Sequence, residues 1–280
     1  MAVPAPSPWR IDPGLARDLS GLIGTPADAG PLALLGAMAD QVPAGTTAKL
    51  DALAAGEPPP GADPDAIARR ILDDRYRGAP TPAWSCWALS TLLAALLDAG
   101  GHPASVIALR RIDDRAPAVD VHSVVLTDSV EEGGRVLLDP YFAAALPGPG
   151  SAEGEGVHRG VRARRIDEPD GRWTYGMDRR GRSGLLDYRS LAADLDRGDV
   201  AAFCAISVTH TGVPPGPCAS LWRAEVATDA YVHGAGGAAV REWRPGPVDP
   251  VEDGHAALTE HPGWAEAAAD MGRRVGFPLR

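Results

Sequence analysis

The feature that most constrains the fold is an apolar run from Trp87 to Leu97, directly after Cys86. The run is rich in Ala and Leu and longer than an ordinary strand, so it predicts a buried helix with Cys86 in its first turn. The pair Gly100 and Gly101 predicts where this helix ends. We expect the rest of the chain to be organised around it.

A β-branched run and a short apolar run follow the predicted helix. His122 lies inside residues 119–127, and Asp139 closes residues 135–139, just before a proline. Such runs predict strands, and the proline ends the pairing. Residues 128–134 have the composition of a hairpin loop, so the two strands are expected to be neighbours.

Cys86, His122 and Asp139 are the predicted catalytic residues. A cysteine at the start of a helix is favoured as a thiolate, a histidine can hold its proton, and a carboxylate can orient the imidazole. Each residue alone also has a structural interpretation, as a core cysteine, a strand histidine or a strand terminator. As an ordered set on helix, strand and strand end, they predict a cysteine nucleophile with a base and its orienting carboxylate.

Composition indicates a globular, cytoplasmic protein. The 280 residues, 45% of them hydrophobic, suffice for two or three domains. The cysteines Cys86, Cys204 and Cys218 are widely spaced and no secretory signal precedes them, so reduced thiols are expected. No apolar run approaches a membrane span, and the net charge of −10 argues against nucleic-acid binding. Abundant Ala, Gly, Pro and Arg with one lysine, Lys49, suggest a bacterial source.

Further elements follow from local signals. Asp63 and Pro64 predict the start of a short amphipathic helix. After residue 101 the pattern changes to strands, which predict an antiparallel meander that forms a sheet or barrel. In the C-terminal third we expect a helix at 191–200, strands at 201–209, 221–227 and 238–243, and a closing helix at 263–272.

Two groups of polar residues have weaker functional interpretations. A basic cluster could contact cofactor phosphates or a carrier protein, or could be a solvated face; it comprises Arg159, Arg162, Arg164, Arg165, Arg179, Arg180 and Arg182. Cys204, His210 and Cys218 offer only three loosely spaced ligands, so no metal site is predicted.

The order and spacing of Cys86, His122 and Asp139 resemble those of the arylamine N-acetyltransferase superfamily. The resemblance extends to Val42-Pro43 and to the C-terminal residues 275–279. It implies an α+β fold with a cysteine-protease-like core, divided into a helical N-terminal domain, an antiparallel β-barrel and a C-terminal α/β lid. We expect these domains at 1–101, 102–190 and 191–280.

The resemblance also implies an activity. Members of the family transfer an acyl group from a thioester, usually acetyl-CoA, through an acyl-cysteine to an amine in a ping-pong mechanism. Acyl-CoA or a carrier-protein thioester would be the co-substrate, with no tightly bound cofactor. Small-molecule thioesters and amines, and an acyl carrier protein as an alternative donor, are the expected partners.

Residues beside the predicted triad depart from the family pattern. Family members usually have Arg-Gly-Gly-aromatic before the cysteine, where this chain has residues 82–85, and Val-Gly-Phe-Gly after the aspartate, where it has residues 140–143. Tyr141 and Ala143 remove the room that glycines give for close backbone approach. A larger acyl thioester, as in the family's amide synthases, is therefore an alternative to acetyl-CoA. Trp84, Tyr141 and Phe142 are the predicted substrate-binding residues.

Other activities remain open on sequence grounds. Residues 85–90 are similar to the nucleophile segment of papain-like peptidases, and His210 lies near the distance expected for their histidine. The chain lacks the cysteine that this family has three residues before the nucleophile, the glutamine that it has shortly upstream to build the oxyanion hole, and any asparagine to orient a histidine. A transglutaminase-like amidase has the same residue order. A relative of the fold that binds ligand without turnover is the third alternative.

Overall fold

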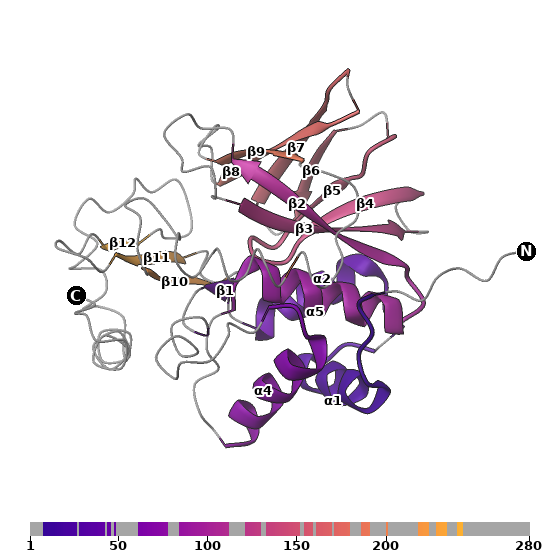
Figure 1. Ribbon diagram of the computed structural model, residues 1–280, viewed down its shortest axis with the longest axis vertical. Helices are drawn as coiled ribbons and strands as arrows, with labels where there is room; N and C mark the ends of the chain where they lie inside the picture. The colour runs from indigo at the N-terminus through magenta and orange to yellow at the C-terminus, as the bar shows by residue number, and fades with distance from the viewer. Residues whose placement is uncertain are drawn as a thin grey trace, which may run out of the picture.

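The structure, a computed structural model, places helices on one side of a large antiparallel sheet, with a smaller sheet beside them (Figure 1). It contains no helix, within the part of the chain that it describes, that is long and apolar enough to cross a membrane. The described residues are 8–26, 28–42, 44–45, 48, 61–77, 84–111, 121–129, 133–151, 154–158, 161–169, 171–179, 186–190, 200, 218–223, 228–233 and 240–242.

The helices begin where the local sequence predicts a start. They are α1 (Pro13–Ile23), α2 (Pro31–Gln41), α4 (Pro64–Tyr76) and α5 (Cys86–Ala99). The first three open on proline, whose missing N–H is no loss in a first turn. The predicted cap of α4 is confirmed, because the Asp63 side chain accepts from the backbone N–H groups of Asp65 and Ala66.

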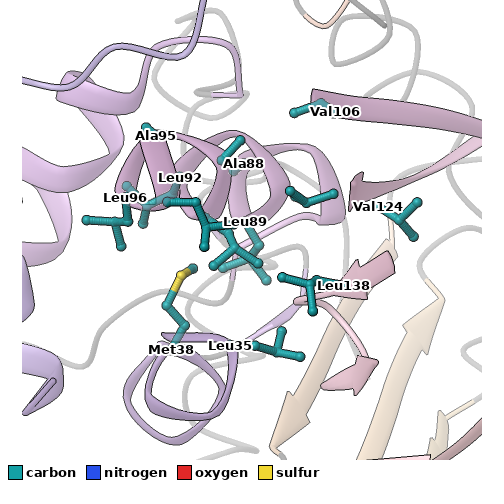
Figure 2. Packing of buried hydrophobic residues seen from close by; sticks show 14 of the residues in the cluster. Leu35, Met38, Ala88, Leu89, Leu92, Ala95, Leu96, Val106, Val124 and Leu138 are labelled. Atoms are coloured by element: carbon teal, nitrogen blue, oxygen red, sulfur yellow. The ribbon is translucent and has the colours of Figure 1, made fainter. Parts of the chain in front are cut away.

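Helix α5 is the buried helix that the sequence predicts. Every residue from Trp87 to Leu97 is buried. Figure 2 shows α5 packed between α2 and the large sheet; the labelled neighbours are Leu35 and Met38 of α2 and Val106, Val124 and Leu138 of the sheet. Each leucine buried here contributes about 1.5–3 kcal/mol relative to leaving it exposed. The helix that carries Cys86 is therefore fixed by the core on both sides.

The large sheet contains the predicted meander, and all of its pairings are antiparallel. Its strand order is β5-β4-β3-β2-β9-β8-β7-β6. The neighbours β2, β3 and β4 confirm that the His122 and Asp139 strands are adjacent. The strands are β2 (Ala104–Arg111), β3 (Val121–Ser129), β4 (Gly134–Asp139), β5 (Ala144–Pro147), β6 (Glu155–His158), β7 (Val161–Asp167), β8 (Trp173–Arg179) and β9 (Leu186–Ser190).

The sheet curls until its two edge strands approach each other. A Cβ atom built on Gly156 of β6 would overlap the Ala145 carbonyl oxygen of β5 and lie 2.8 Å from the Leu146 Cα. Arg165 of β7 also donates to the Pro147 carbonyl at the end of β5. No ladder joins β5 to β6 among the described residues, so a closed barrel stays a prediction.

A second, four-stranded sheet joins the N-terminal and C-terminal parts of the chain. Its β1 (Ala44–Gly45) pairs with β10 (Cys218–Arg223), followed by β11 (Thr228–His233) and β12 (Val240–Glu242). Ala44 also bridges to Trp84, which directly precedes the cap of α5. Strands were expected near β10 and β12, whereas β11 was not predicted. The elements expected at 201–209 and 263–272, and all but residue 200 of the helix expected at 191–200, lie outside the described residues.

We predict that Gly156→Ala destabilises the protein, because the added methyl group must push β5 and β6 apart. A decrease of about 1–3 kcal/mol in the free energy of unfolding is expected for overpacking of this kind. Gly134→Ala is the matched control, since a Cβ on that strand glycine meets nothing within 4 Å. Urea unfolding of both variants checks the prediction. Equal stabilities would show that the edges of the sheet do not pack closely.

Candidate active site

Cys86 is the first residue of α5, and its thiol is not part of a disulfide and is partly buried. The Ser85 side chain caps the helix by accepting from the backbone N–H of Ala88 at 3.4 Å. The thiol therefore lies at the positive end of the helix dipole, among backbone donors of the first turn. This environment favours the thiolate and offers N–H groups to an oxyanion.

His122 and Asp139 form a buried pair on neighbouring strands. The Nε2 atom of His122 lies 2.8 Å from the Oδ2 atom of Asp139, and their exposed fractions are 4% and 0%. His122 also shares a hydrogen bond with Cys86. Because Nε2 faces the carboxylate, Nδ1 is the ring nitrogen left for the thiol. The structure thus brings all three predicted residues together.

Four donors surround the Asp139 carboxylate. Its Oδ1 atom accepts from the backbone N–H groups of Tyr141, at 3.0 Å, and Phe142, at 3.1 Å. Its Oδ2 atom accepts from His122 and from the hydroxyl of Tyr175, at 2.9 Å. These bonds compensate for removing the carboxylate from water and fix its direction.

Tyr175 is a site residue that the sequence does not reveal. It lies on β8, 36 residues beyond Asp139, and its ring is fully buried. The alternating pattern around it predicts a strand, but a strand tyrosine with a buried ring is most often a core residue. Only the curl of the sheet brings its hydroxyl to the carboxylate.

Two aromatic side chains of the turn after β4 pack against His122. The ring centroids of His122 and Phe142 are 5.2 Å apart, those of His122 and Tyr141 are 6.0 Å apart, and the two aromatic rings meet edge to face. Ala143 closes the turn at φ 53°, a left-handed conformation that costs a non-glycine residue about 1–2 kcal/mol. The turn after β4 therefore packs two aromatic rings beside the imidazole.

The pKa of His122 is raised from 6.5 to about 10. Burial by itself lowers this pKa. The charges of Asp139 and Cys86, with hydrogen bonds to both, raise it, and together they outweigh the effect of burial. His122 therefore carries a proton at neutral pH, and negative charge on Cys86 favours that proton. Such a pair holds a nucleophile ready to attack a carbonyl carbon and a proton ready for a leaving group.

The predicted substrate-binding residues differ in exposure. Tyr141 is half-buried, whereas Trp84 and Phe142 are buried. The indole N–H of Trp84 meets no acceptor among the residues that the structure describes. These three roles stay predictions. No group of three potential metal ligands gathers within the described ranges.

The basic cluster is divided between two environments where the structure describes it. The side chains of Arg162 and Arg164 are exposed on β7. Arg165 is buried and pairs with Asp167, with its Nε atom 2.7 Å from Oδ1. Arg165 therefore belongs to the packing of the sheet and offers no charge to a ligand.

We predict that Asp139→Asn lowers the pKa of His122 by about one to three units, because it removes a counter-charge while the ring stays buried. The pH titration of the imidazole nitrogen signals by NMR measures this shift. Asp128→Asn is the control, since Asp128 lies on β3, the strand that carries His122, but its side chain is exposed. An unchanged His122 titration in Asp139→Asn would contradict the proposed pairing.

Comparison with known proteins places this geometry in a known fold. No protein-family model and no curated protein matches the chain. Among solved structures, it is similar to the arylamine N-acetyltransferase of Mycobacterium smegmatis, with a TM-score of 0.68 and 18% identity over 95% of this chain and 97% of that one. The Mycobacterium marinum enzyme in complex with CoA gives a TM-score of 0.68 at 17% identity, over 92% and 95% of the two chains. The Nocardia farcinica enzyme gives 0.65 at 15% identity, over 98% and 96%. The chain therefore has the α+β fold of the arylamine N-acetyltransferases.

Proposed function

We propose that this protein is an acyltransferase that moves an acyl group from a thioester, through an acyl-cysteine on Cys86, to an amine. The observation that carries the proposal is the buried array in which His122 links the Cys86 thiol to the Asp139 carboxylate. Its occurrence in the arylamine N-acetyltransferase fold supports acyl transfer over other thiol chemistry.

In the first half-reaction, the Cys86 thiolate attacks the thioester carbonyl carbon. Backbone N–H groups at the start of α5 stabilise the oxyanion. The tetrahedral intermediate then breaks its bond to the donor sulfur, which leaves as a thiol with the proton from Nδ1 of His122. The products are acyl-Cys86 and a neutral imidazole, whose Nε2–H remains bonded to Asp139.

In the second half-reaction, an amine attacks the acyl-cysteine carbonyl carbon. Neutral His122 accepts a proton from the attacking nitrogen, and the carbon–sulfur bond breaks as the amide forms. Cys86 leaves as the thiolate, which restores its pair with the imidazolium. The predicted lid, residues 191–280, would exclude water between the two steps.

The turn after Asp139 bears on the choice of donor. The M. marinum structure contains CoA, which supports an acyl-CoA thioester as the donor class. In this chain the half-buried ring of Tyr141 packs beside His122. A side chain at this position restricts backbone approach by the donor's thiol arm. We therefore propose that the donor is either acetyl-CoA or a larger acyl thioester, including a carrier-bound one. We further propose that the side chain of Tyr141 determines which of these donors the site accepts.

We predict that incubation with the correct thioester adds one acyl group to the chain. Intact-mass analysis against acetyl-CoA, longer acyl-CoAs and carrier-mimicking thioesters measures the adduct. Cys86→Ala should abolish it, while Cys218→Ala is the control that should retain it. Absence of an adduct across the whole panel would instead favour a relative that binds ligand without turnover.

We predict ping-pong kinetics, because both half-reactions use one nucleophile and one base. Varying donor and acceptor together should give parallel double-reciprocal lines, with slow hydrolysis when no amine is present. Intersecting lines without acyl-Cys86 would indicate direct transfer in a ternary complex. Rapid hydrolysis without acceptor preference would support the amidase or peptidase interpretation.

A further inference from the structure

Two buried serines join the helix that carries Cys86 to the strand that carries His122. Ser90 lies one helical turn after Cys86, and Ser123 follows His122 directly. The Ser90 hydroxyl donates to the Ser123 carbonyl oxygen at 3.1 Å, and the Ser123 hydroxyl donates to Ser90 Oγ at 3.1 Å. Both side chains are fully buried. These two hydrogen bonds therefore connect α5 and β3 close to Cys86 and His122.

The bond from Ser90 reaches strand β3 beyond the end of one of its ladders. The pairing of β3 with β4 ends at Val125 and Leu138, two residues short of Ser123, while the pairing of β3 with β2 continues to Val121. The Ser90 hydroxyl donates to the Ser123 carbonyl in this region, so it couples helix α5 to the part of β3 that carries His122.

We propose that Ser90 and Ser123 are positioning residues that hold the Cys86 sulfur at the Nδ1 atom of His122. The nucleophile and its base lie on different elements, so their separation depends on how α5 seats on β3. A thiolate–imidazolium pair weakens as its two charges move apart. The serine contact lies within one helical turn of the thiol, where a small tilt of the helix changes that separation. The inference rests on the proposed roles of Cys86 and His122.

The neighbouring residue supplies a matched control. Thr91 is also buried on α5, and its hydroxyl donates to the Gly61 carbonyl at 2.8 Å. That bond has the same chemistry but fastens α5 to the segment before α4. Thr91→Val therefore removes a buried helix hydroxyl bond without loosening the contact between α5 and β3.

The test measures the alkylation rate of Cys86 by iodoacetamide as a function of pH in the full-length chain, with urea unfolding in parallel. In the wild type, the reactive thiolate should persist well below the free-thiol pKa of about 8.5. Ser90→Ala should move the midpoint toward that value and slow alkylation about tenfold at the acidic end. Thr91→Val should lose stability but keep the wild-type profile.

Two further variants separate positioning from packing. Ser90→Thr restores the hydroxyl and should restore the profile, whereas Ser123→Ala keeps the main bond and should give a smaller shift in the same direction. If Ser90→Ala does not fold, the pH profile of Cys86 alkylation in Ser123→Ala decides the test. Profiles that match the wild type in folded Ser90→Ala or Ser123→Ala, or an equal shift in Thr91→Val, would overturn the proposal. Because no acyl donor is used, failure of the acyl-transfer proposal would leave this result standing.

Discussion

The burial of one carboxylate organises the site. Asp139 has no exposed surface, so each of its oxygen atoms needs donors from the protein. The donors come from β3, from β8 and from the turn that follows β4. Four hydrogen bonds on one side chain therefore require the curl of the sheet, the sharp turn and the neighbouring strand to be in place together.

The core provides the rigidity that this arrangement needs. Helix α5 is buried from Trp87 to Leu97, and it packs against α2, α4 and the large sheet. Removing a helix so extensively packed from its position would expose many large side chains, each of which contributes to the free energy of folding. Cys86, the proposed nucleophile, thus sits at the start of a helix that is buried in the core, as a site that must hold reacting atoms in position requires.

The electrostatics of the site follow from this packing. In water, His122 and Cys86 would both be neutral near pH 7 for most of the time. In the protein, the buried carboxylate holds an imidazolium, and the imidazolium favours the thiolate. The aromatic rings of Tyr141 and Phe142 pack beside the histidine, and the burial of the ring by itself disfavours its charged form, so the attraction of Asp139 has to outweigh that burial. Fixed charges in a dry environment thereby favour the reactive protonation states.

Local signals in the sequence determined the elements of the site and their order. Three of these features depend on residues close together in the chain: the Asp63 cap, the apolar helix that begins at Cys86, and the hairpin between the His122 and Asp139 strands. The period of apolar residues, the caps and the turn residues encode such features directly. The candidate triad could be predicted because each of its residues sits on an element of this kind.

Tertiary structure alone decided the contacts between distant segments. Four contacts link residues that are far apart in sequence. Two are side-chain hydrogen bonds, from the Tyr175 hydroxyl to Asp139 and from Ser90 to Ser123. The other two are strand pairings, of β2 with β9 and of β1 with β10. A buried tyrosine or serine has the same local pattern whether it supports a carboxylate or fills the core. Which partner it meets depends on the curl of the sheet and the seating of α5, and those are set by packing of the whole core rather than by neighbours along the chain.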